Sequence, residues 1–104
     1  MFVHSGMLTL KKDAVESAGP SIKQGMLALV GRIPGLRGVS IGLSAGINPG
    51  TASLLFLLSF ESEDAWRKYG DHPAHKTLIA EHIAPALEDK QFFQSREWES
   101  RSAE

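Results

Sequence analysis

The sequence has no cysteine in its 104 residues, which excludes disulfide bonds, thiolate metal sites and a cysteine nucleophile. It also lacks an excess of charge of either sign, because its 11 Lys and Arg residues nearly balance its 12 Asp and Glu residues. Nucleic acid and anionic membrane surfaces are therefore not favoured as partners. No basic segment precedes an apolar run at the start, and no run reaches membrane-spanning length, so we expect a cytoplasmic protein.

The strong signatures of several enzyme classes are missing as well. There is no Gly-x-Ser-x-Gly nucleophile motif and no glycine-rich phosphate loop after a predicted strand. The histidines His72, His75 and His82 lack the i, i+4 spacing with an adjacent acid that is typical of helical zinc sites. We therefore expect neither a cofactor nor a metal. The length and the ordinary composition, 42% hydrophobic and 22% charged, fit one domain over residues 1–104 with a single core.

Apolar periodicity predicts an α+β domain. Asp13 and Glu16 stand at capping-box spacing, but Gly19 and Pro20 interrupt the pattern, and proline suits a first helical position. Two strand-helix-strand units in one antiparallel sheet describe a ferredoxin-like protomer, with a four-stranded sheet and helices on one face. The predicted strands are 2–11, 36–45, 53–60 and 91–99. The predicted helices are 20–33, 61–69 and one from Pro73 to Pro85, with Leu78, Ile79 and Ile83 on its buried side and His82 as a further candidate for that side.

The stretch SLLFLLSF at 53–60 is apolar on both faces of a strand. Helices can cover only one face of the sheet, and a large exposed apolar face is uncommon in a stable monomer. We therefore expect a homodimer formed sheet to sheet. The alternative is that the second face is only half-exposed beside loops. The helix-facing set is Leu54, Phe56, Leu58 and Phe60, and the opposite set is Leu55 and Leu57.

The stretch FESEDAWRKYGDHPAHKTL at 60–78 resembles the stress-responsive α/β barrel (Dabb) family. Members carry a strand that ends in Phe-x-Ser or Phe-x-Asp, then a short helix, then Tyr-x-x-His-Pro-x-His. An early histidine, here His4, and the Ile-Pro-Gly at 33–35 also fit. The matching residues are Phe60, Ser62, Tyr69, His72, Pro73 and His75.

The resemblance implies protomers that pair as a dimeric α/β barrel, each with a cavity between its sheet and its helices. It favours a small stress-related protein whose hydrophobic cavity takes a small apolar or aromatic ligand. The alternative is a cofactor-independent enzyme resembling a polyketide cyclase or an isomerase, with His75 as general base. Cyclase-type members have a further histidine where this chain has Leu54, which disfavours the enzyme.

Tyr69 and His75 are the candidate catalytic residues and, with His4, the candidate pocket residues. Because Pro73 starts a helix, His72 is expected at its N-cap and His75 in its first turn, leaning back toward the helix start. His75 would then face the cavity, or would bond a backbone carbonyl and order the turn. Tyr69 is alternatively a core aromatic residue, and His4 alternatively a hydrogen-bonded core histidine.

Overall fold

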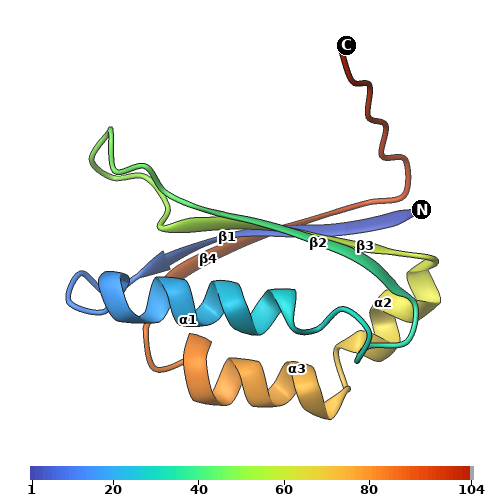
Figure 1. Cartoon of the computed structure of the whole chain (residues 1–104), viewed down its shortest axis with the longest axis horizontal. Helices are drawn as coiled ribbons and strands as arrows, with labels where there is room; N and C mark the ends of the chain where they lie inside the picture. The colour runs from blue at the N-terminus through green and yellow to red at the C-terminus, as the bar shows by residue number, and fades with distance from the viewer. Residues whose placement is uncertain (104) are drawn as a thin grey trace.

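Four antiparallel strands form one layer, and helices cover one of its faces (Figure 1). This computed structural model describes residues 1–103. Among them no helix has the length and apolar character needed to cross a membrane. The elements are β1 (Phe2–Leu10), α1 (Val15–Leu27), β2 (Leu36–Leu43), β3 (Leu54–Phe60), α2 (Glu63–Tyr69), α3 (Pro73–Leu78), the π-helical turn η1 (Ile79–Ile83) and β4 (Leu87–Ser95).

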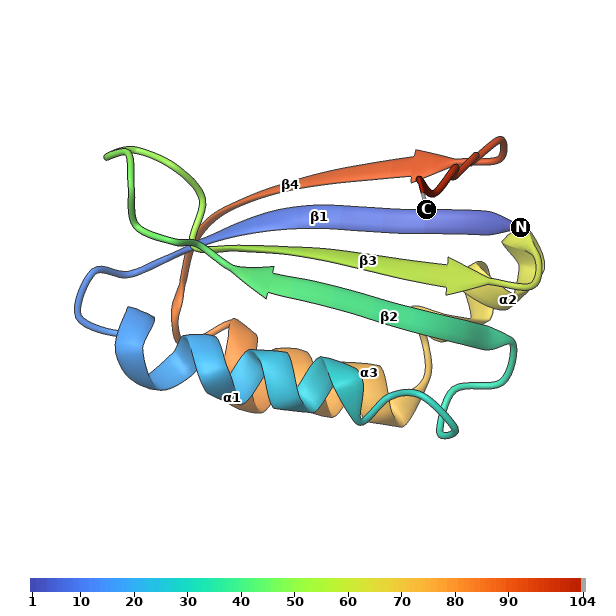
Figure 2. The same cartoon turned by 45° about the horizontal axis from the view of Figure 1, so that its top comes forward.

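The strand order is β2-β3-β1-β4, with every neighbouring pair antiparallel (Figure 2). The first strand lies inside the sheet, where Gly6 pairs with Phe56 of β3 on one side and Phe92 of β4 on the other. Two β-α-β halves therefore interleave in one sheet, which is the ferredoxin-like arrangement. The predicted fold class is confirmed.

Alternation along the strands separates the two faces of the sheet. The four predicted helix-facing side chains of β3 are all buried, between 0% and 3% exposed, in a core shared with Ile22, Met26 and Leu29. The opposite face, which no helix covers (Figure 1), carries Met7, Leu55 and Phe93, exposed by 42%, 54% and 56%. The predicted apolar second face is therefore present.

The prediction for the first helix was wrong at both ends. The helix begins at Val15, encloses Pro20 and ends at Leu27. Pro20 removes the hydrogen bond to the carbonyl of Glu16 and its ring crowds that carbonyl, but both residues are exposed, so the carbonyl can bond to water instead. Asp13 does not cap the helix, whose N-cap is Ala14 without a side-chain hydrogen bond. Val30, which lies inside the predicted helix 20–33, is instead in a turn after the helix and is 48% exposed.

The last strand was predicted four residues too late. It begins at Leu87, directly after the turn at 84–86 that contains Pro85, and pairs with β1 from Leu10↔Leu87 to Val3↔Ser95. As an edge strand it is mostly exposed, so its side chains do not show the apolar alternation of a half-buried strand. On the helix from Pro73, Ile79 was expected on the buried side but is 38% exposed, and the further candidate His82 is exposed as well.

Candidate functional site

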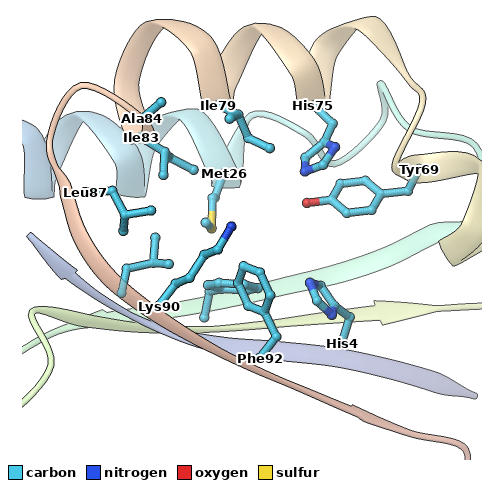
Figure 3. Close-up of a pocket in the computed structure, with 12 residues that line it drawn as sticks. His4, Met26, Tyr69, His75, Ile79, Ile83, Ala84, Leu87, Lys90 and Phe92 are labelled. Carbon is cyan, nitrogen blue, oxygen red and sulfur yellow. The ribbon is translucent and has the colours of Figure 1, made fainter.

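A cavity of about 170 Å³ lies between the sheet and the α3–η1 segment (Figure 3). Most of its wall is apolar and comes from α1, β1, β3, η1 and β4. The π-helical turn contributes Ile79 and Ile83, and its widened hydrogen bond, from Ala84 N–H to the Ile79 carbonyl, also brings Ala84 to the wall. Only four lining residues have polar side chains: His4, Tyr69, His75 and Lys90.

His4 stands on the helix-facing side of β1 and is buried among aromatic rings, 5.5 Å from Phe56 and 5.4 Å from Phe92 between ring centroids. Its Nδ1 lies 2.9 Å from the side-chain Nε2 of Gln94. Because an amide nitrogen donates, Nδ1 accepts and the proton of the neutral ring lies on Nε2. Burial, with a smaller effect of His75, lowers the pKa of His4 from 6.5 to about 4. His4 is thus hydrogen-bonded in the core and also lines the cavity.

The segment from 70 to 75 gives its two histidines different places. Nδ1 of His72 accepts a hydrogen bond of 3.1 Å from Ala74 N–H, and Pro73 occupies the first turn of α3. The predicted N-cap is confirmed, and His72 does not line the cavity. The ring of His75 leans back toward the helix start, with Nδ1 3.3 Å from the Gly70 carbonyl.

The contact with Gly70 decides the tautomer of His75. A carbonyl only accepts, so Nδ1 of a neutral ring donates and Nε2 keeps its lone pair. Burial is the main cause that lowers the pKa of His75 below its ordinary value. The side chain is therefore a neutral imidazole at pH 7 with one accepting nitrogen. It bonds the backbone and lines the cavity at once.

Tyr69 ends α2, and its ring is packed between Phe60 and His75, with centroid distances of 5.3 Å and 4.0 Å. The residue is 6% exposed, and its hydroxyl points into the cavity (Figure 3). Burial raises the pKa of this hydroxyl above its ordinary value. Tyr69 is therefore a neutral hydrogen-bond donor at pH 7, and none of the hydrogen bonds within residues 1–103 uses its hydroxyl.

Lys90 was missed by the sequence reasoning. In the sheet it pairs with Leu8 and so belongs to the cavity face of β4, next to Phe92 on that face. The predicted strand began at residue 91, which left Lys90 in a loop. The signal was the alternation of Lys90, Phe92 and Gln94, which became readable only once the strand was known to begin at Leu87.

The arrangement can hold a small apolar body and present it with a donor hydroxyl, an accepting imidazole nitrogen and a cation. Leu54, which replaces the further histidine of cyclase-type proteins, is buried at the start of β3 and does not line the cavity. Within residues 1–103, no three His, Cys, Asp or Glu side chains form a group that could hold a metal ion.

These features define a class: a ferredoxin-like α+β protomer with a cavity between sheet and helices. The chain belongs to the stress responsive A/B barrel domain (Dabb) family, whose model matches residues 2–95. The resemblance carried by the Tyr-x-x-His-Pro-x-His motif is thus confirmed. No curated protein sequence matches the chain.

Solved structures share the fold at low sequence identity. A dimeric ferredoxin-like protein of unknown function from Thermobifida fusca is 24% identical, with 90% of this chain and 88% of that chain covered and a TM-score of 0.78. A dimeric protein of unknown function from Bacteroides fragilis is 22% identical, with coverages of 90% and 93% and a TM-score of 0.78. A putative antibiotic biosynthesis monooxygenase from Nitrosomonas europaea is 17% identical, with coverages of 91% and 96% and a TM-score of 0.74.

Proposed function

We propose that this chain is a homodimeric binding protein whose cavity holds one small apolar or aromatic molecule, in line with the stress-related role that the family name suggests. The observation that carries the proposal is the convergence of the Tyr69 hydroxyl and the His75 imidazole on a cavity whose wall is mostly apolar. Its volume of about 170 Å³ is slightly larger than an apolar cavity of ~150 Å³ that takes up benzene. One substituted ring therefore fits.

The homodimer is proposed from the second face of the sheet. On this face Met7 of β1 pairs with Leu55 of β3, and Leu57 follows Leu55 on the same strand. Ser5 of β1 lies between Leu57 of β3 and Phe93 of β4 and pairs with both. An exposed and largely apolar sheet face of this kind is typical of an interface. The neighbours from Thermobifida fusca and Bacteroides fragilis are described as dimeric, which supports the same assembly here.

Binding is tested with 4-methylphenol, titrated into isotopically labelled protein and followed by the amide NMR signals of the cavity wall. We expect saturable binding that weakens about 5–20-fold in Tyr69→Phe and in His75→Leu, because each loses one hydrogen bond to the ring hydroxyl. The matched control is His72→Ala. It loses the N-cap bond and about 1 kcal/mol of stability, yet it leaves the dissociation constant unchanged because His72 lies outside the cavity.

Two results would contradict the proposal. One is the absence of any saturable shift at the cavity wall in the folded wild-type protein. The other is equal affinity in the wild type, Tyr69→Phe and His75→Leu, which would show that the two polar groups do not face the bound ring.

A second candidate is a cofactor-independent enzyme that removes a proton next to a carbonyl group. The observation in its favour is the tautomer of His75, whose accepting nitrogen remains neutral at pH 7 and can take up such a proton. This enzyme activity is tested by the rate at which the α-protons of phenylacetone exchange in D₂O. The rate should be higher with wild-type protein than with His75→Leu. Equal rates for the two proteins would reject the enzyme and leave the binding protein.

A further inference from the structure

We infer that the occupant of the cavity is a small monoanion, an apolar ring or chain bearing one carboxylate that is held by Lys90. This inference rests on the proposed binding function and adds the charge of the ligand. It follows from the position of Lys90, from the charges around it and from the neutral state of the other polar lining residues.

Lys90 is directed to the cavity by the register of β4. Its partner on β1 is Leu8, another lining residue, and the next side chain on the same face is Phe92. The ammonium lies 5.5 Å from the centroid of the Phe92 ring, within the range of a cation–π contact. Figure 3 shows the Lys90 ammonium and the Tyr69 hydroxyl both directed toward the middle of the cavity.

The ammonium has no anionic partner within residues 1–103. The four ion pairs there join Arg37 to Glu61, Arg67 to Glu63, Lys68 to Asp64 and Arg96 to Glu63. The neighbouring Asp89 pairs with Thr9 on the opposite face of the sheet and accepts a hydrogen bond from the backbone of Lys90. Among the residues that the structure describes, no Asp or Glu lines the cavity, and Lys90 supplies the one formal charge of the wall at pH 7.

A carboxylate suits this wall better than a neutral polar group does. An ionised acceptor gains a charge-assisted hydrogen bond from the ammonium, roughly twice as strong as a neutral one. The Tyr69 hydroxyl can add a second donor, while the apolar wall takes the rest of the ligand. A cationic ligand would meet Lys90 without any compensating carboxylate, so the wall also selects by repulsion.

The test compares two ring compounds of the same shape, 4-methylbenzoate and 4-methylbenzamide, by calorimetry or NMR at pH 7.5 and low salt. We expect the wild type to bind the benzoate at least ~10-fold more tightly. Lys90→Met should abolish that preference, and Lys90→Arg should retain it. Lys12→Met is the control, because Lys12 is exposed and does not line the cavity. Added salt should reduce the preference, since Lys90 is exposed to solvent.

The outcomes separate the two proposals. Equal affinity of the wild type for both compounds, or an unchanged preference in Lys90→Met, overturns the assignment of charge and leaves the cavity as a binding site. Binding of neither compound, nor of 4-methylphenol, by folded protein overturns the binding function itself and the assignment with it.

Discussion

His4 shows how a single side chain makes stability depend on pH. Its ring packs against Phe56 and Phe92, and within residues 1–103 its hydrogen-bond partner is Gln94. Burial lowers its pKa from 6.5 to about 4. Below pH 6.5 the unfolded chain takes up a proton at this residue, whereas the folded chain does so only near pH 4. The neutral ring therefore contributes stability that is complete above pH 6.5 and declines as the pH falls toward 4.

We predict that His4→Gln, which cannot titrate, removes part of this decline. Between pH 7.5 and 4.5 the wild type should lose roughly 2 kcal/mol more stability than the variant. Urea unfolding of both proteins at both pH values measures the difference. The pKa of His75 is also lowered, but His75 is present in both proteins, so its contribution cancels in the comparison. The pKa of Glu63 is lowered to about 2, so its loss of charge affects stability mainly at lower pH. Equal losses in the two proteins would show that His4 is not protected from protonation.

At the scale of the elements, Gly6 fixes how closely aromatic rings approach the central strand. A Cβ atom at this position would lie 2.6 Å from Cδ1 of Phe92 and 2.7 Å from Cε2 of Phe56. Neither ring can give way without altering the cavity, since both rings line it. Gly6 does not have a positive φ, so its backbone conformation would allow other residues. Glycine is needed here because the two rings leave no space for a side chain.

We expect Gly6→Ala to destabilise the protein by about 1–3 kcal/mol, the usual cost of overpacking a core, and to weaken binding of 4-methylphenol. Gly42→Ala is the matched control on β2, because nothing lies within 4 Å of a Cβ there. It should stay within ~0.5 kcal/mol of the wild type. Urea unfolding of both variants decides the matter, and similar unfolding midpoints would mean that the two rings move aside freely.

The elements also show what the sequence could predict. The doubly apolar pattern of 53–60 and the role of Pro73 follow from local rules, and both predictions agree with the structure. The start of α1 was not predicted correctly. The rule that places proline in the first turn of a helix does not consider that the carbonyl of Glu16 is exposed and can bond to water when Pro20 lies inside the helix. The start of β4 depends on pairing with β1, a partner far away in the sequence. Lys90 could not be identified as a cavity residue without that pairing.

For the whole molecule, the two faces of the sheet have separate uses. One face forms the core and the cavity, and the other presents Met7, Leu55 and Phe93 to the outside. The loop between β2 and β3 and the segment after β4 both rise on this outer side, at opposite ends of the sheet (Figure 1). They leave the middle of the apolar face open to a second copy of the chain.

We therefore predict that Leu55→Glu dissociates the proposed homodimer. An unpaired carboxylate buried between two sheets costs several kcal/mol, whereas Leu55 in a single protomer is already 54% exposed. Ile47→Glu is the control, since Ile47 is 83% exposed in the loop between β2 and β3. Analytical ultracentrifugation at micromolar concentration should give a dimer for the wild type and Ile47→Glu. A wild-type monomer at that concentration would disprove the assembly.

The central place of β1 in the sheet also matters during synthesis of the chain. Its second neighbour, β4, is the last strand to leave the ribosome, and Val3 finds its partner Ser95 only then. Until that point β1 is an unprotected edge, and the cavity lacks the wall that Phe92 and Lys90 provide. Pairing with β4 therefore closes an edge of β1 that could otherwise pair with another chain.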